Sequence, residues 1–173
     1  MKNVYENLCR LHDILTKYAA ILAAILLGLI VTAYVFEVIA RYFFNSPTSW
    51  VSDFVSYALA VSIFLALPKV TQDNGHVAVT IVVDIIPAKA ADVVYTIVSL
   101  IGFACLAFSA YVSLQENTRQ YIKDIETLAI NPVPQWWISS FITFGLAMSA
   151  LHMLRNAPSS NRVKAEALSG GAN

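Results

Sequence analysis

Four long apolar runs dominate this sequence and restrict it to a membrane fold. They cover residues 18–40, 51–67, 90–114 and 133–154, and each is close to the ~20 residues that a helix needs to cross about 30 Å of hydrocarbon. The runs do not alternate polar and apolar residues as barrel strands do. Turn-forming residues fall between them. The sequence therefore predicts an all-α integral membrane protein with four transmembrane helices in residues 18–155.

Composition agrees with lipid as the main solvent. The chain is 58% hydrophobic and only 13% charged, with a mean hydropathy of +0.64, far from the balance of a soluble domain. The formal net charge is zero, so no general field favours nucleic acid as a partner. Four spans leave little chain for a separate soluble domain, so we expect function to lie in the helices, their loops and their partners.

The lysine and arginine residues predict the orientation of the spans. Eight of them fall in the N-terminal stretch, the middle loop and the C-terminal tail, against three in the other two loops. Since cytoplasmic loops carry the excess of positive charge, both termini are expected in the cytoplasm. Trp50, Trp136 and Trp137 then lie at the outer interface, where amphipathic rings are favoured.

The two ends of the chain differ from the spans. Residues 1–17 place apolar and polar side chains on opposite faces of a helix, a pattern typical of an amphipathic helix that lies in the membrane interface. It could anchor the spans, brace a partner or simply lead into the first span. Residues 76–87 are apolar but too short to cross, so we expect them at the inner membrane surface or against protein. Residues 156–173 are predicted to be a disordered cytoplasmic tail.

Few ionisable residues lie within the runs, and each is a functional candidate because charge is costly in lipid. Glu37 and Arg41 are spaced to form an ion pair one helical turn apart. Asp53 follows Trp50 at the start of the second run, where a carboxylate favours a helix N-terminus. In both cases a structural role is the favoured interpretation. A self-contained exporter that uses Glu37 as its coupling carboxylate is an alternative.

Histidines raise the question of a cofactor. His12, His76 and His152 fall in the N-terminal stretch, the middle loop and the end of the fourth run, and they do not form the facing pair within spans that a membrane haem needs. A haem or quinone anchor with His76 and His152 as ligands remains the alternative reading. The sequence has no nucleophile motif, phosphate loop or metal-spaced cluster, so we predict no enzyme activity, no cofactor and no metal.

Small residues recur at four-residue spacing in three of the runs. Such stripes let helices approach closely in lipid, where packing drives association. They serve either packing within the chain or docking to the helices of another protein, and both readings are open. The stripes are Ala20, Ala24 and Gly28 in the first run, Ala58, Ser62 and Ala66 in the second, and Gly145 and Ser149 in the fourth.

Short motifs around the spans resemble a known family. Arg41 precedes an aromatic triplet, and Trp50 stands three residues before Asp53; Gly75-His76 and an apolar stretch follow the second run; Pro134-x-Trp136 opens the fourth, with Gly145 downstream. In this order and spacing the motifs resemble the small membrane subunit, or DctQ-type subunit, of tripartite ATP-independent periplasmic (TRAP) transporters. The likeness covers about residues 10–155. The family often has Glu at the position of Asp53.

The resemblance implies a function that the residues alone do not supply. A subunit of this type pairs with a large membrane subunit, which holds the sodium and substrate sites, and with a soluble periplasmic substrate-binding protein. This chain would then be a non-catalytic part of a sodium-coupled transporter for organic acids in the bacterial inner membrane. It would brace the large subunit, contact membrane lipids and help dock the binding protein through residues of the shared motifs.

Overall fold

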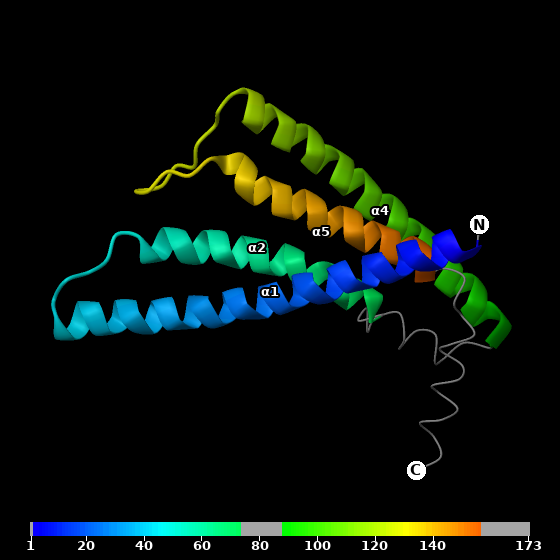
Figure 1. Ribbon diagram of the computed structural model, residues 1–173, viewed down its shortest axis with the longest axis horizontal. Coiled ribbons are helices and arrows are strands. Elements are labelled where there is room, and N and C mark those ends of the chain that lie inside the picture. The colour runs from blue at the N-terminus through cyan, green and yellow to red at the C-terminus, as the bar shows by residue number, and fades with distance from the viewer. Residues whose placement is uncertain (1, 74–87, 157–173) are drawn as a thin grey trace, which may run out of the picture.

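The computed structural model describes residues 2–73 and 88–156, and the side chains of residues 6–73 and 96–155. Within these residues it contains four helices and no strand: α1 (Lys2–Phe43), α2 (Val51–Gln72), α4 (Ala88–Ile122) and α5 (Gln135–Asn156) (Figure 1). All four are long and apolar enough to cross a membrane. The four predicted transmembrane helices are thus confirmed.

Helix α1 runs without interruption through Lys17, where the sequence analysis placed a change from an interfacial helix to a span. No proline lies between Lys2 and Phe43, so nothing in this stretch forces the helix to break. The amphipathic segment is therefore the first part of one 42-residue helix. Its position in a membrane interface stays a prediction. The segments 76–87 and 157–173, whose positions were predicted above, lie outside the described residues.

Helices α1 and α2 form an antiparallel hairpin with a regular seam. Their buried residues recur at alternating intervals of mostly three and four, the 3.5-residue period of left-handed coiled-coil packing. Most members of the seam are small, which permits close approach in lipid. The buried residues are Thr16, Ala19, Ala23, Ile30, Ala33 and Glu37 on α1, and Val51, Val55, Ala58, Ser62, Leu65, Pro68 and Thr71 on α2.

The small-residue stripe expected on the first run does not face α2. Ala24 is exposed, and a Cβ atom built on Gly28 would meet nothing within 4 Å. The seam instead uses the neighbouring face, with Ala19 and Ala23. The sequence could not choose between these faces because nearly every position of the run is apolar. On the second run the expected residues Ala58 and Ser62 are indeed buried.

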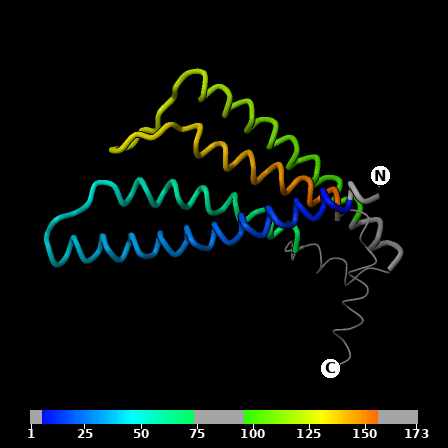
Figure 2. The backbone as a smooth tube through the Cα atoms, in the orientation of Figure 1, coloured from blue at the N-terminus to red at the C-terminus, as the bar shows by residue number. Residues whose placement is uncertain are grey.

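The four helices lie side by side in the order α1, α2, α5, α4, and extensive packing joins each helix to the next. Figures 1 and 2 show two hairpins that meet near the start of α1 and diverge toward their loops. We call the edge with loops 44–50 and 123–134 the loop end, and the edge where α1 begins and α5 ends the terminal end. The chain is therefore a spread layer of helices rather than a closed bundle.

A ladder of hydrogen bonds joins α4 to α5. In a membrane, polar side chains between helices find partners on the neighbouring helix because lipid offers none. The sequence analysis emphasised apolar span centres and did not identify this ladder. Its rungs are Ser113 with Thr143 at 2.8 Å, Asn117 with Ser140 at 2.9 Å and Gln120 with Ser139 at 2.6 Å.

Candidate functional site

Glu37 ties α1 to the loop that follows it. Its Oε1 accepts hydrogen bonds from Nε and Nη2 of Arg41 at 3.2 and 2.7 Å, as the i,i+4 spacing predicted. Its Oε2 accepts from the backbone N–H of Thr48 at 3.1 Å and from the Thr48 hydroxyl. The Glu37 residue is only 8% exposed. Because both oxygens are occupied, this carboxylate acts as a clasp that fixes the turn into α2.

Asp53 lies in the first turn of α2 and connects it to the other loop. Its Oδ2 accepts a hydrogen bond from the backbone N–H of Asn131 at 3.2 Å. One turn further on, the Tyr57 hydroxyl donates to Oγ1 of Thr127 at 2.8 Å, and the same oxygen accepts the N–H of Val133 at 3.0 Å. These bonds hold loop 123–134 against the start of α2, so the two loops form one connected loop end.

Aromatic residues at the loop end have two kinds of surroundings. Trp50 is 46% exposed and lies between Phe36 and Phe54, with ring centroids at 6.3 and 6.2 Å. Together with residues of α1 these rings line an open apolar groove of about 390 Å³. Trp136 instead packs edge-on against Tyr121 at 5.4 Å. Trp50 is thus presented to the surroundings, whereas Trp136 closes the α4–α5 hairpin.

Pro134 of the Pro-x-Trp motif and the downstream Gly145 both pack inside the chain. Pro134 forms an isolated bridge with Glu126 across the base of loop 123–134. Gly145 lies against α2, where an added Cβ would come within 2.1 Å of the backbone oxygen of Phe64. The sequence left open whether the glycine faces a partner. Gly75 and His76, the remaining motif residues, lie outside the described residues.

A polar cluster at the terminal end joins three helices. Asp13 of α1 accepts hydrogen bonds at Oδ1 from Nε2 of Gln72 on α2 at 2.9 Å and from Nη2 of Arg155 on α5 at 2.6 Å. The second contact is an ion pair between residues 142 positions apart. This cluster fixes the start of α1 to the ends of α2 and α5.

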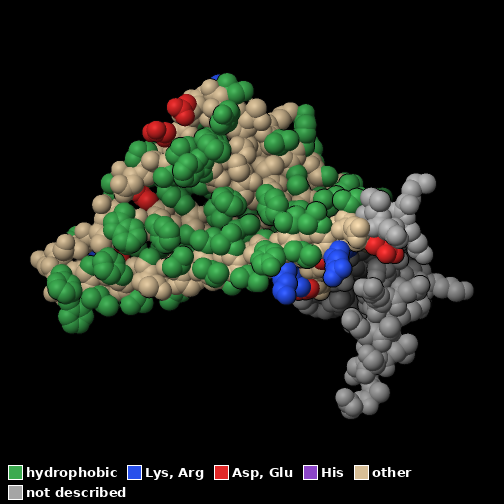
Figure 3. Space-filling model, viewed as in Figure 1, with side chains coloured by type: hydrophobic (Ala, Val, Ile, Leu, Met, Phe, Trp, Pro, Cys, Tyr) green, Lys and Arg blue, Asp and Glu red, His purple; other side chains and the backbone are tan. Residues whose placement is uncertain are grey.

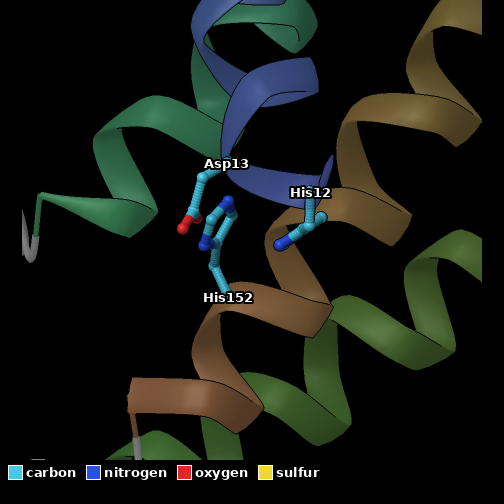
Figure 4. A group of neighbouring side chains, drawn as sticks. All are labelled: His12, Asp13 and His152. Atoms are coloured by element: carbon cyan, nitrogen blue, oxygen red, sulfur yellow. The ribbon is translucent and has the colours of Figure 1, made fainter. Parts of the chain in front are cut away.

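Two histidines meet within this cluster, as Figure 4 shows. The rings of His12 and His152 lie 3.9 Å apart between centroids, tilted by 33°, and Nε2 of His152 lies 2.7 Å from Oγ1 of Thr16. His152 is fully buried. The sequence analysis placed His12 in the N-terminal stretch and His152 at the end of the fourth run, and it did not pair them. The spacing of His12, Asp13 and Thr16 on one helical face was the available signal.

The geometry at both ends of the layer favours a structural role for these residues over ion coupling or haem binding. Glu37 has both oxygens committed to Arg41 and Thr48, which leaves it without a free oxygen for ion coupling. His152 has the His12 ring 3.9 Å away, so a porphyrin cannot lie between these two rings. The described residues therefore form a connected scaffold with polar ties at its ends and apolar faces between them.

A layer of four apolar helices that can cross a membrane defines the class: this is a multi-pass helical membrane protein. The family model for the DctQ component of tripartite ATP-independent periplasmic transporters matches residues 30–160. A Haemophilus influenzae protein, provisionally named a TRAP transporter small permease protein, is 22% identical over 147 residues, which cover 85% of this chain and 83% of the relative.

The chain therefore belongs to the DctQ family and is the small permease subunit of a TRAP transporter. Membership confirms the resemblance found in the sequence motifs. It also places the chain in the bacterial inner membrane as a multi-pass transport protein. Membership in this family implies that the transporter also contains a large membrane subunit and a binding protein.

Proposed function

We propose that this chain is the non-catalytic brace of a sodium-coupled TRAP transporter for organic acids, with both termini in the cytoplasm. The observation that carries the proposal is the spread layer itself. Almost none of the side chains in the span of α4 are buried within the chain, and Figure 3 shows hydrophobic side chains over much of the visible face. Such faces suit contact with another membrane subunit and with lipid.

The loop end is the proposed docking region for the periplasmic binding protein. The backbone N–H groups of Thr48 and Asn131 donate hydrogen bonds to Glu37 and Asp53 and so hold both loops in place. The surface is therefore ordered before a partner binds. Large apolar side chains project from it without cover from the described residues. They are Tyr42, Phe43, Phe44, Trp50, Leu128 and Ile130. Aromatic side chains on an ordered surface are typical anchors of protein interfaces.

Reconstituted transport tests the brace. Proteoliposomes would contain the large subunit with or without this chain, and uptake of radiolabelled dicarboxylates, sialic acids or sulfonates would be followed with the binding protein present. We expect uptake to need both membrane subunits and an inward sodium gradient. Uptake by the large subunit alone, at the rate of the complex, would contradict the brace. Uptake that is unchanged without sodium would contradict the coupling.

Two other readings have less support. A haem anchor through His76 and His152 would need His152 to reach a haem, whereas its Nε2 is bonded to Thr16 and its ring is covered by His12. A haem absorption band in the purified chain would support it. An exporter that uses Glu37 would need a carboxylate that exchanges ions, whereas Glu37 is held by Arg41 and Thr48. Transport by the chain alone would favour that reading.

A further inference from the structure

Hydrogen bonding fixes the tautomer of His152. The Thr16 hydroxyl donates its hydrogen to the backbone oxygen of His12 at 3.0 Å, so it has none left for His152. With the hydroxyl hydrogen placed there, the 2.7 Å contact between Thr16 Oγ1 and His152 Nε2 is satisfied with the histidine as donor. Nδ1 of His152 consequently carries a lone pair, and this buried atom has no hydrogen-bond partner in the part of the chain that the structure describes. It is a free ligand atom inside the protein.

His12 has the complementary arrangement. Its Nε2 is buried and likewise has no hydrogen-bond partner among the described residues, while the backbone of Met148 on α5 is a hydrogen-bond acceptor that influences the ring. Because Nε2 is unpaired, Nδ1 is the nitrogen that can donate to this acceptor. Each ring therefore keeps one unpaired nitrogen and has a protein acceptor for the other. Metal-binding histidines are held in this way, with the outer N–H fixed by a protein acceptor.

Asp13 adds a carboxylate to the two rings. Both of its hydrogen bonds, from Gln72 and Arg155, go to Oδ1, so Oδ2 remains available as a ligand. One donor atom from each of His12, Asp13 and His152 lies within 4.8 Å of the other two, and in Figure 4 the three side chains converge. Hydrogen bonds to a ligating carboxylate are also usual in metal sites. Gln72 and Arg155 would supply them here.

We infer that His12, Asp13 and His152 form a binding site for a divalent transition metal of the zinc class. Two imidazoles, one carboxylate and a water complete the four-coordinate set that Zn²⁺ takes in proteins. One possible ligand atom of each residue already lies within 4.8 Å of the others. On binding, the three ligand atoms come to about 3.4 Å from one another, the separation at which each is about 2.0–2.1 Å from a tetrahedral ion. The rings turn out of their stacked arrangement to aim their lone pairs at it.

The site has both a route for the ion and a structural consequence. His12 and Arg155 line an open groove of about 530 Å³ between α1 and α5, through which an ion can reach the ligands. The Arg155 charge remains paired with Oδ1 of Asp13 at 2.6 Å. Since the ligands come from α1 and α5, the bound ion joins the two hairpins where they meet. Metal binding thereby stabilises the folded layer.

Zinc binding by the full-length, tag-free chain in detergent tests this site. After dialysis, zinc content is measured by mass spectrometry and affinity by competition with a chromophoric chelator; bound Co²⁺ reports tetrahedral geometry by its visible absorption. We expect one ion per chain and a higher melting temperature with zinc. His12→Gln and His152→Gln should each weaken binding at least about 10-fold, as even the loss of an outer-shell partner does.

The third histidine of the sequence provides the matched control, since His76→Gln should bind zinc as the wild type does. His12 is only half-buried, so His12→Gln decides the matter even where His152→Gln fails to fold. Equal zinc affinity and equal thermal shifts in wild type and His12→Gln would overturn the site. So would a wild-type chain that retains no zinc after dialysis, or binding that is lost in His76→Gln.

Discussion

Gly145 of α5 packs directly onto the backbone carbonyl of Phe64 in α2. A Cβ atom at position 145 would lie 2.1 Å from that oxygen and 2.8 Å from its carbon. Pro68 lies four residues after Phe64 and has no N–H to donate to this carbonyl, which is left without its helical partner. The α-hydrogen of Gly145 points at the oxygen instead and can form a weak C–H···O contact. Proline and glycine therefore act together to bring the two hairpins into contact.

Gly145→Ala should separate α2 from α5. The new methyl group would collide with backbone, which cannot rotate away, so α5 has to shift. We expect the free energy of unfolding to fall by about 3 kcal/mol, the upper range for overpacked cores. Denaturant titration in detergent, followed by circular dichroism, measures this change.

Gly28→Ala is the matched control for that substitution. Gly28 lies in α1, and an added Cβ would meet nothing within 4 Å. We expect an unchanged chain or one stabilised by up to about 1 kcal/mol, the difference in helix propensity between alanine and glycine. Equal effects of the two substitutions would mean that the α2–α5 contact does not depend on glycine.

Glu37→Gln should loosen the turn between α1 and α2. The amide of glutamine offers one acceptor oxygen and one donor NH₂, whereas Arg41 and Thr48 both present donors. The glutamine NH₂ group then faces the donors of either Arg41 or Thr48 and cannot accept their hydrogens. We expect a loss of about 1–3 kcal/mol of unfolding free energy. Thermal unfolding in detergent provides the measurement.

Glu116→Gln compares the clasp with an exposed ion pair. Glu116 pairs with an arginine on its own helix, Arg119 at 2.6 Å, and accepts a hydrogen bond from Gln120 at 3.2 Å. Both side chains of the ion pair are about half exposed. Exposed pairs contribute roughly 0–1 kcal/mol, so this variant should be close to wild type. If Glu37→Gln is equally mild, the bonds to Thr48 contribute nothing measurable.

The sequence predicted the features that depend on residues close together along the chain. Helix length followed from the apolar runs, and the Glu37–Arg41 pair followed from i,i+4 spacing. Thr48, the second partner of Glu37, was missed because it lies in a loop 11 residues away, and no periodicity describes a loop. The α4–α5 ladder was missed for a related reason. Its polar residues are identified as partners only once the register of the two helices is known.

The hydrophobic pattern of the sequence did not predict which residues form the contacts between different helices. In water, the apolar side of an amphipathic helix identifies the buried face, but a span such as 18–40 is apolar all round. Ala20, Ala24 and Gly28 were therefore as plausible a seam as Ala19 and Ala23, which the fold uses. The meeting of His12 with His152 depends on the angle at which α1 crosses α5. That angle results from packing in the whole layer.

Thr16→Val should destabilise the terminal end. Valine has nearly the shape of threonine but leaves the buried Nε2 of His152 without its hydrogen-bond partner. An unpaired buried donor costs about 1–3 kcal/mol, to be measured as a loss of unfolding free energy. Thr16→Ser keeps the acceptor and should restore most of it. Thr32→Val is the control, because among the described residues the exposed Thr32 hydroxyl bonds to the Gly28 carbonyl of its own helix alone. We expect a change there within about 0.5 kcal/mol.

Trp50→Ala should weaken assembly with the transporter partners without affecting membrane insertion. Trp50 is 46% exposed at the loop end, so its removal leaves the helix seams intact and takes a large anchor from the proposed docking surface. Loss of one interface anchor typically costs about 2 kcal/mol or more, or roughly 30-fold in affinity. Arg41→Ala should act in the same direction, because Arg41 is also exposed there and orders Glu37.

The measurement is binding of the periplasmic protein to the reconstituted membrane complex, with uptake followed in parallel. Trp137→Ala is the matched control, since Trp137 is 54% exposed but lies on α5 rather than in the groove with Phe36 and Phe54. We expect Trp137→Ala to bind the periplasmic protein within about twofold of wild type, because most interface substitutions away from anchors cost little. Wild-type binding and uptake in both Trp50→Ala and Arg41→Ala would show that the loop end is not a docking surface, and the apolar faces of the layer would then have to carry all partner contacts.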